Sequence, residues 1–159
     1  MSAHPKARQL DEKILKELLR DARLSYRELS RRVKCSVVTV AQRVRRMEEE
    51  GTLKGYSALV DQEKLGYVIT AITEVTVSKG RLLEVQDQIA KLDSVCAVYD
   101  VTGAVDSVVI SKFRTRDELS SFTKELLAVP HVERTNTHVV LNTCKEDFRC
   151  PAYREQKPR

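Results

Sequence analysis

The segment from Ser36 to Gly51, "SVVTVAQRVRRMEEEG", constrains the fold most strongly, because it combines a helix start, an apolar stripe and a helix stop. Serine is a preferred N-cap residue, and a glycine just beyond the last turn commonly ends a helix. At 100° per residue, the apolar side chains of this helix gather on one face. They are Val37, Val40, Ala41, Val44 and Met47. We expect this stripe to pack against other helices.

Two shorter helical patterns precede this segment. Residues 10–23 carry apolar side chains at helical spacing. These are Leu10, Ile14, Leu15, Leu18 and Leu19. Ser25 and Glu28 then form a capping-box pattern, and the apolar face of a short second helix continues at Leu29 and Val33. The order of helix, short helix, tight turn and longer helix predicts a helix-turn-helix unit. A three-helix packing unit with no role in nucleic-acid binding is the alternative.

The remaining circumference of the third helix is polar and is not needed for the core. In helix-turn-helix proteins the last helix enters the major groove by its N-terminal end. Threonine, glutamine and arginine side chains hydrogen-bond to base edges and phosphates, and an exposed valine touches a thymine methyl group. The predicted DNA-binding residues are Ser36, Val38, Thr39, Gln42, Arg43 and Arg46. Glu48, Glu49 and Glu50 would be repelled by the duplex, so only the N-terminal half of the helix is expected to dock.

The distribution of charge agrees with a nucleic-acid-binding N-terminal unit. Residues 1–60 hold 14 Lys/Arg and 8 Asp/Glu, a net charge of +6, whereas residues 61–159 hold 14 and 15, a net charge of −1. Together these give the net charge of +5 of the whole chain. A localised basic excess is suited to phosphate neutralisation. A solvated basic surface without a ligand is the simpler explanation.

The rest of the chain shows a regular alternation of strand and helix patterns. Residues 52–61 alternate enough for a short strand, and residues 61–67 suggest a brief turn or helix. From residue 67 onwards the patterns follow the order βαββαβ, and Leu82, Val85, Ile89 and Leu92 form the apolar face of the first helix of this unit. We therefore expect an antiparallel sheet with both helices on one face. The uncovered face predicts at least a homodimer, in which a second copy buries it.

Several classes of protein are excluded by what the sequence lacks. No apolar run reaches the roughly 18 residues of a membrane span, and the start of the chain has no apolar signal-peptide core. We expect a cytoplasmic protein with no membrane partner. No P-loop, G-x-S-x-G, H-E-x-x-H or paired-cysteine pattern occurs, so we expect no catalytic residues, no metal and no cofactor. Cys35, Cys96, Cys144 and Cys150 are expected to be reduced, although Cys144 and Cys150 lie close enough in sequence to pair.

The chain resembles the Lrp/AsnC family of bacterial and archaeal transcription regulators, also called feast/famine regulatory proteins, from about residue 9 to residue 142. The stretches that carry the resemblance are "LDEKILKELLRDARLSYRELSRRV", "RVRRMEEEGTLKGYSALVD", "EKLGY", "TGAVDSVV" and "VERTNTHVVL". The resemblance implies an α+β chain with a helix-turn-helix (winged-helix-like) domain and a ferredoxin-like βαββαβ domain that binds an effector. It also implies that the protein binds double-stranded DNA, often at operators that are imperfect palindromes, and that it is associated with the nucleoid. The expected assembly is a dimer, and dimers are expected to join into tetramers or octamers.

The same resemblance implies an amino-acid effector, bound between dimers near the loop that carries the G-x-x-D pattern. Here the loop reads Thr102, Gly103, Ala104, Val105 and Asp106. A glycine lets backbone N–H groups approach an α-carboxylate, and an aspartate can hold an ammonium group. A hairpin turn with a solvated aspartate is the simpler explanation. Many relatives have an acidic residue directly after the glycine, whereas this chain has Ala104, which argues against a basic amino acid.

The last predicted strand adds two threonines to the candidate effector site. Thr135 and Thr137 share one face of the strand and Asn136 lies on the other, so two hydroxyl groups can face a polar ligand. Threonine is also simply a good strand residue. Glutamine or another polar uncharged amino acid is the first expectation. His131 and His138 have no metal-ligand spacing.

These patterns predict four regions and one function. The regions are 1–51, the DNA-binding domain; 52–66, a linker; 67–143, the effector-binding and oligomerisation domain; and 144–159, a C-terminal tail. We expect a transcriptional regulator whose operator affinity or assembly responds to a small ligand. The alternative is a stand-alone amino-acid sensor, or an enzyme-associated ligand-binding module, without DNA binding.

Overall fold

The computed structural model describes residues 5–149 and contains two compact units, which we call the head and the body. Within the described range, the head consists of residues 5–59 together with residues 146–149. The body consists of residues 60–145. The chain therefore leaves the head, builds the whole body and then returns to the head.

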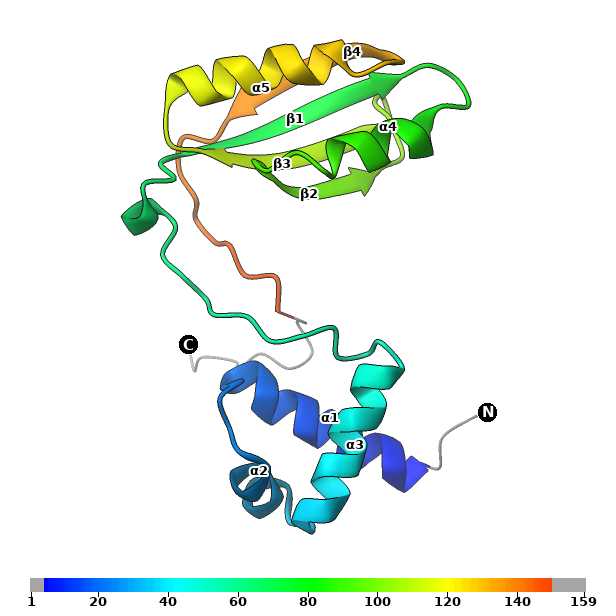
Figure 1. The fold of residues 1–159 in the computed structure, drawn as a ribbon, viewed down its shortest axis with the longest axis vertical. Helices are drawn as coiled ribbons and strands as arrows, with labels where there is room; N and C mark the ends of the chain where they lie inside the picture. Colours follow the sequence, from blue (N-terminus) through cyan, green and yellow to red (C-terminus); the bar gives the residue numbers. More distant parts are fainter. Residues whose placement is uncertain (1–4, 150–159) are drawn as a thin grey trace. The chain divides into compact units, whose positions relative to one another are not determined.

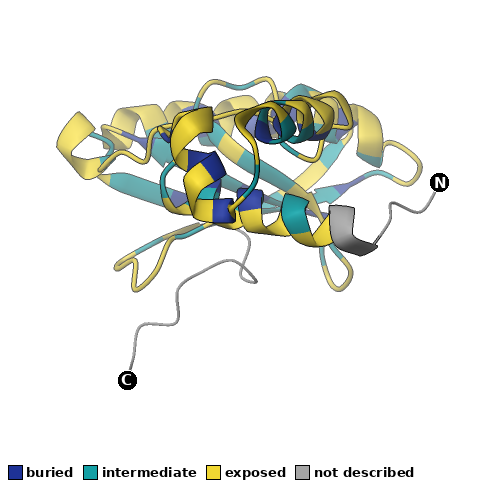
Figure 2. Cartoon of the chain, turned by 90° about the horizontal axis from the view of Figure 1, so that it is seen from below, coloured by how far each residue is buried: buried dark blue, intermediate teal, exposed yellow. Residues whose placement is uncertain are grey.

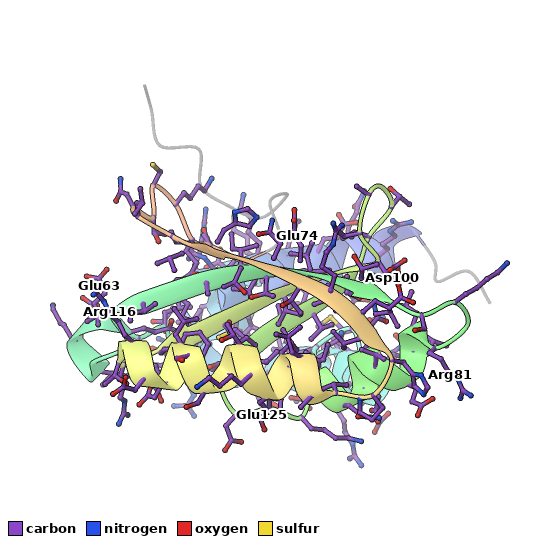
Figure 3. All side chains as sticks on the ribbon, turned by 90° about the horizontal axis from the view of Figure 1, so that it is seen from above. Glu63, Glu74, Arg81, Asp100, Arg116 and Glu125 are labelled. Atoms are coloured by element: carbon purple, nitrogen blue, oxygen red, sulfur yellow. The ribbon has the colours of Figure 1, made fainter. Side chains whose placement is uncertain are left out.

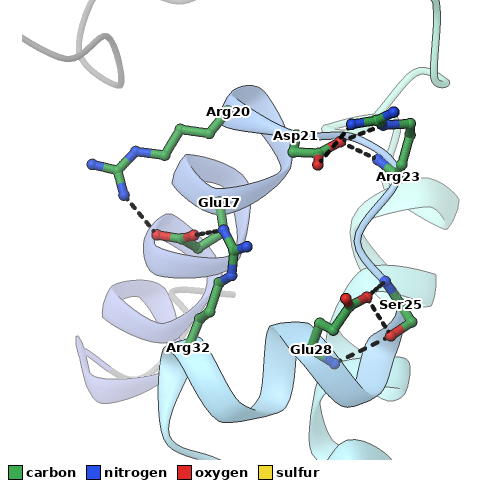
Figure 4. A network of polar contacts seen from close by, with 7 residues as sticks. All are labelled: Glu17, Arg20, Asp21, Arg23, Ser25, Glu28 and Arg32. Atoms are coloured by element: carbon green, nitrogen blue, oxygen red, sulfur yellow. Dashed lines mark hydrogen bonds and ion pairs between the residues drawn. The ribbon is translucent and has the colours of Figure 1, made fainter.

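Three helices form the head, labelled in Figure 1. They are α1 (Pro5–Arg20), α2 (Tyr26–Val33) and α3 (Val37–Glu49). The predicted capping box is confirmed, because the Ser25 hydroxyl accepts from the Glu28 N–H while the Glu28 carboxylate accepts from the Ser25 N–H. The first helix begins earlier than predicted and ends at Arg20 rather than residue 23. The Asp21 carboxylate accepts hydrogen bonds from the backbone and side chain of Arg23, which holds a turn there (Figure 4).

The core of the head is built from the predicted apolar faces of the three helices. Ile14, Leu18, Leu29, Val33, Val40, Val44 and Met47 are all buried and form one cluster. Dark blue turns on the head helices in Figure 2 mark this buried side. The prediction for Val37 is wrong, because its side chain remains 43% exposed. The packed stripe of α3 begins one turn later, at Val40.

The body confirms the predicted α+β class and the βαββαβ order. Its elements are β1 (Ile69–Val77), α4 (Leu82–Ile89), β2 (Val95–Asp100), β3 (Ser107–Phe113), α5 (Arg116–Ala128) and β4 (Val132–Val139). The strands form one sheet in the order β2-β3-β1-β4, and every neighbouring pair is antiparallel. This is the ferredoxin-like arrangement that the sequence pattern predicts.

Both helices cover the same face of this sheet, as expected. Alternate residues of β1 and β3, such as Val75 and Val109, are buried in one cluster with Val85 and Ile89 of α4 and Phe122 of α5. We call this the covered face. The opposite face, called the open face, carries the intervening residues. In Figure 3, Glu74 lies on the side of the sheet away from α5.

Two segments between and within the units differ from the sequence-based expectation. Residues 52–61 form no strand, and Glu63–Leu65 form a single 3₁₀ turn. A strand needs a neighbour to pair its backbone groups, and none lies beside this segment within the described chain. Helix α4 is also shorter than predicted, because it ends at Ile89. No helix among residues 5–149 is both long enough and apolar enough to cross a membrane.

Candidate DNA-binding helix and effector loop

The N-terminal turn of α3 is fixed by two hydroxyl groups. The Ser36 hydroxyl accepts a hydrogen bond from the Thr39 N–H at 3.0 Å, which makes Ser36 the N-cap as predicted. The Ser36 and Thr39 hydroxyls also lie 2.8 Å apart and share a hydrogen bond. These two side chains therefore set the geometry of the helix start, and each still has capacity to bond to a ligand.

Beyond this cap, the N-terminal half of α3 presents uncovered side chains. Val38 is 65% exposed, and Gln42 is exposed one turn further along the helix. Thr39 lies half-buried between them. An apolar group and an amide on the same open surface match the types of group that read base edges in a major groove.

The three arginines of α3 are held in different ways. The Arg43 side chain is only 24% exposed, and its guanidinium lies 3.6 Å from the Asp11 carboxylate of α1. Arg46 is more open and donates to Glu50 at 2.6 Å, a hydrogen bond that raises the Arg46 pKa above its ordinary value. Arg45 has the most exposed side chain of the three, at 81%, and pairs with Glu49. If Arg45 and Arg46 contact DNA phosphates, their guanidinium groups would leave Glu49 and Glu50 and pair with the phosphates instead.

Helix α2 adds cations that the sequence analysis did not assign to the DNA surface. Arg27, Arg31 and Lys34 are all exposed on α2 or directly after it. Arg32 is held differently, since its guanidinium donates to the Glu17 carboxylate of α1 at 2.9 Å (Figure 4). The basic excess of residues 1–60 and the predicted second helix were the available signals, and the structure adds that these three side chains are exposed.

The predicted effector loop, residues 102–106, lies in the segment that joins β2 to β3. Gly103 has φ +133°, which L side chains rarely adopt, so glycine fits the conformation required there. The Asp106 carboxylate accepts a hydrogen bond from the Val77 N–H at 2.8 Å, and the Asp106 N–H donates to the Val75 carbonyl. Asp106 therefore anchors the loop to the end of β1. Thr102, Gly103 and Ala104 are exposed.

The two threonines of β4 share one face, as the alternation of strand residues predicts. Thr137 pairs with Thr73 across the sheet, and their hydroxyls lie 3.1 Å apart. Thr135 lies opposite Val75. Thr73 and Val75 are buried on the covered face, so both threonines belong to that face and Asn136 belongs to the open one.

A hollow of about 290 Å³ lies where β4 and the effector loop meet. Its lining residues are Glu74, Thr76, Val105, Arg134, Thr135 and Asn136. Of the predicted effector residues only Thr135 is in this lining, while the loop contributes Val105. The Asn136 amide donates to the Glu74 carboxylate at 3.0 Å, and this hydrogen bond is the main cause of the lowered Glu74 pKa.

The charges of this hollow were not identified from the sequence. A carboxylate at Glu74 and a guanidinium at Arg134 line the same space, and together they complement the ammonium and carboxylate of a zwitterion. Residues 74 and 134 are far apart in the chain and are brought together by the pairing of Thr76 with Arg134 and of Glu74 with Asn136. Knowledge of the β1–β4 register was needed to find them.

The described residues contain no group of three or more His, Cys, Asp or Glu side chains arranged to hold a metal ion. His138 instead lies 3.0 Å from the Asn136 amide and 3.6 Å from the Glu74 carboxylate. The suggested pairing of Cys144 with Cys150 involves a residue outside the described range.

Comparison with known sequences matches both units. Residues 70–150 match the family model of the Lrp/AsnC ligand binding domain, and residues 8–54 match that of a winged helix-turn-helix DNA-binding domain. An uncharacterized HTH-type transcriptional regulator of Pyrococcus furiosus is 44% identical over 140 residues, covering 88% of this chain and 95% of the relative. HTH-type transcriptional regulator FL11 of Pyrococcus horikoshii is 35% identical over 143 residues, covering 90% of this chain and 95% of the relative.

Comparison with solved structures gives the same result for the fold. A transcriptional regulator from Neisseria meningitidis in complex with L-Met aligns with a TM-score of 0.81 and 27% identity, covering 90% of this chain and 95% of that one. LrpC of B. subtilis aligns with a TM-score of 0.77 and 31% identity, covering 92% of this chain and 100% of that one. None of these four proteins is named as an enzyme.

Proposed function

Because this chain belongs to the Lrp/AsnC family of DNA-binding transcriptional regulators, we propose that it reads operator DNA with the N-terminal half of α3 and that a small ligand bound by the body controls this binding. The proposed DNA-contacting residues are Ser36, Val38, Thr39, Gln42, Arg43 and Arg46. The observation that carries the proposal is the open surface of Val38 and Gln42 directly after the N-cap of a third, basic helix. The chain is a regulator rather than an enzyme.

The arginines are proposed to contribute in unequal degree. Arg46 is exposed and can turn from Glu50 to a phosphate, which an ion pair between exposed groups permits at small cost. Arg43 is more enclosed, and its partner Asp11 has a second carboxylate oxygen that is buried without a hydrogen-bond partner. Removal of Arg43 would therefore disturb the packing of α1 against α3 as well as DNA binding.

The DNA test should use Gln42→Ala and Arg46→Ala rather than Arg43→Ala, since both side chains are exposed. In a gel-shift titration we expect Gln42→Ala to lose about 1–3 kcal/mol of discrimination between operator and mutated operator. Arg46→Ala should weaken binding to all sequences and reduce the slope of log K against log salt by about one. Arg8→Ala serves as the matched control, because Arg8 is an exposed arginine of α1 that pairs with Glu12. Unchanged operator binding in both test variants would refute this assignment of the recognition surface.

The proposed effector is an amino acid with a polar uncharged side chain, glutamine first. Its proposed site comprises Thr102, Gly103, Ala104, Asp106, Thr135 and Thr137. The hollow beside the loop supports an amino acid, since Glu74 and Arg134 supply the two opposite charges that a zwitterion needs. Ala104 supports an uncharged side chain, because the loop offers no carboxylate at that position. The solved relative from N. meningitidis is itself a complex with L-Met.

Thermal stability in the presence of each of the twenty amino acids tests the effector. A ligand that binds the native state raises its melting temperature, and at 100 times the Kd the stabilisation is about 2.7 kcal/mol. We expect glutamine or a similar polar amino acid to give the largest rise, and Arg134→Gln to reduce it. If none of the twenty shifts the melting temperature, the effector proposal fails, whereas the gel-shift result stands independently.

The proposed regulation acts through assembly. Two heads of a homodimer would contact successive major-groove faces of double-stranded DNA about one helical turn apart. Dimers would join into tetramers or octamers, and the ligand would favour one assembly over another. Such control requires a different ligand affinity in the two assemblies. Sedimentation velocity with and without glutamine measures it directly, and an unchanged distribution would contradict this mechanism.

A further inference from the structure

The turn between α2 and α3 bends the chain at Lys34. The backbone of Lys34 has φ 56° and ψ 49°, which is the left-handed helical conformation. Its N–H donates to the Ser30 carbonyl of α2, and the N–H of Cys35 donates to the same oxygen at 3.1 Å. The turn is therefore held by two hydrogen bonds that depend on this conformation at residue 34.

Lysine is an unfavourable residue for this conformation. A Cβ atom crowds the following carbonyl oxygen there, so turns of this kind commonly use glycine. Among residues 5–149, five glycines have a positive φ, and the two other residues that do are Lys34 and His131. The sequence thus keeps a lysine at a position where the backbone favours glycine.

The Lys34 side chain gives the head no contact that offsets this cost. The residue is exposed, and within the described chain its ammonium forms neither a hydrogen bond nor an ion pair. Residues held in unfavourable backbone conformations cluster at functional sites, where the side chain serves binding rather than folding. Lys34 therefore requires an explanation outside its own chain.

Two exposed arginines of α2 continue the positive charge of Lys34. Arg27 and Arg31 are four residues apart, so their side chains lie on the same face of the helix, and Lys34 follows three residues later. Neither guanidinium forms an ion pair among residues 5–149. Glu28, the only acidic residue of α2, is engaged with Ser25 in the capping box. We call Arg27, Arg31 and Lys34 the basic strip.

The basic strip ends directly before the proposed recognition helix. Lys34 is two residues before Ser36, the N-cap of α3, so their Cα atoms are at most about 7.6 Å apart, at 3.8 Å per residue. The ammonium of lysine is a point charge on a flexible four-carbon side chain. From this position it can reach phosphates that flank the base pairs proposed to be read by Val38 and Gln42.

We propose that Lys34 binds a DNA phosphate beside the recognition helix, and that Arg27 and Arg31 bind neighbouring phosphates. This inference rests on the proposed reading of DNA by α3, and it adds contacts that position that helix without reading the sequence. Lys34 then lowers the stability of the head and raises its affinity for DNA, because neutralisation of a phosphate releases a counterion.

The variant Lys34→Gly separates these two effects, because its expected results have opposite signs. We expect the melting temperature of the full-length protein to rise by several degrees, since the left-handed conformation has no steric penalty in glycine. In gel-shift titrations we expect weaker binding to operator DNA and to a random-sequence duplex alike. The slope of log K against log salt should be smaller by about one for each head that is bound.

Three further variants serve as controls. Lys34→Arg keeps the charge, so it should keep the affinity, the salt slope and the melting temperature of the parent protein. Lys16→Ala removes one exposed positive charge from α1, and it should change the salt slope by less than Lys34→Gly does. His131→Gly relieves a left-handed backbone in the body, so it should raise the melting temperature without changing DNA binding.

The outcomes distinguish this inference from the proposed function. If Lys34→Gly keeps the affinity and salt slope of the parent while Gln42→Ala loses operator discrimination, the phosphate contact is refuted and the recognition surface stands. If the affinity of Lys34→Gly falls only together with its melting temperature, the lysine has a structural role and the inference is again refuted. If neither Lys34→Gly nor Gln42→Ala changes binding, both proposals fail.

Discussion

Tyr56 shows how one side chain joins an irregular segment to a helix. Tyr56 lies in the irregular segment that follows α3, and its hydroxyl donates to the Glu48 carboxylate of α3 at 3.0 Å. Burial raises the pKa of Tyr56 from 10.0 to about 12, and the hydrogen bond to Glu48 adds to the shift. The folded head therefore favours the neutral phenol of Tyr56.

This shift predicts a loss of head stability at alkaline pH. Because the folded pKa lies above the unfolded value, the contribution of Tyr56 is complete below pH 10.0 and is lost as the pH rises towards about 12. Titration of phenolate absorbance should show one tyrosine that ionises late. Tyr56→Phe should remove this late component, and Glu48→Gln should move it towards 10.0. A late component that persists in Tyr56→Phe would contradict the assignment.

For single residues, the sequence predicted structural roles better than it predicted contact partners. Ser36 is the N-cap that its position before an apolar stripe indicates. By contrast, the pairing of Arg43 with Asp11 and the hydrogen bond from the Val77 N–H to Asp106 join residues that are distant in the chain. Local spacing carries no information about such contacts, so the half-buried state of Arg43 could not be foreseen.

Helix α2 depends on its capping box to an unusual extent, because it has only eight residues. Isolated helices of this length are unstable in water, and caps and tertiary packing must support them. Ser25 satisfies the Glu28 N–H, and Glu28 satisfies the Ser25 N–H and hydroxyl. These hydrogen bonds lower the pKa of Glu28, so the carboxylate contributes above pH 4.5 and its contribution is lost as the pH falls through the lower folded value.

We predict that Ser25→Ala destabilises the head by about 1 kcal/mol, the typical cost of losing a serine N-cap. Urea unfolding followed by circular dichroism measures the change. Ser57→Ala is a suitable control, because the Ser57 hydroxyl is exposed and makes only a weak local hydrogen bond to Ala58 at 3.4 Å. Equal unfolding midpoints for the two variants would show that the capping box does not support α2.

Whole elements were predicted well where periodicity and caps coincide. Helices α2 and α3 have both signals, whereas α1 and the four body strands were predicted from periodicity alone. The predicted strand in residues 52–61 fails because alternation alone does not supply a pairing partner. The prediction that Val37 is buried is wrong for a different reason. A helical wheel shows the direction of a side chain around the helix axis, but it does not show how far along α3 the packing of the other helices extends.

The open face of the body carries apolar side chains that remain partly exposed in the described chain. Ile72 lies opposite Ile110 of β3, and Tyr99 lies opposite Val108, so apolar side chains from three strands share this face. Ile72 and Tyr99 are 37% and 44% exposed. An apolar sheet face of this kind is suited to burial against an identical face through a two-fold axis.

We propose that the open face forms a homodimer interface, and we predict that Ile72→Asp leaves the protein monomeric at micromolar concentration, because a charge would be buried in that apolar interface. Sedimentation velocity provides the measurement. Leu83→Asp is the matched control, since Leu83 is 78% exposed on α4, a helix that packs on the covered face. Dissociation by Leu83→Asp but not by Ile72→Asp would assign the interface to the helical side instead.

At the scale of the chain, the charge difference between residues 1–60 and 61–159 correctly predicted a DNA-binding unit at the N-terminal end. The ligand-binding role of the second unit was predicted from the family resemblance and not from charge. The return of residues 146–149 to the head was not predicted. It depends on contacts of Arg149 with Leu19, and short segments of mixed polarity carry no periodic signal that would indicate such contacts.

That return makes the body an insertion within the head rather than an appendage to it. A chimeric regulator made with one crossover near residue 60 would take residues up to 59 of its head from one protein. Residues 146–149 of the same head would come from the other protein. A body exchanged between relatives would need two junctions, one near residue 60 and one near residue 145. A hybrid made with only the junction near residue 60 would contain residues 146–149 that did not evolve with the rest of its head.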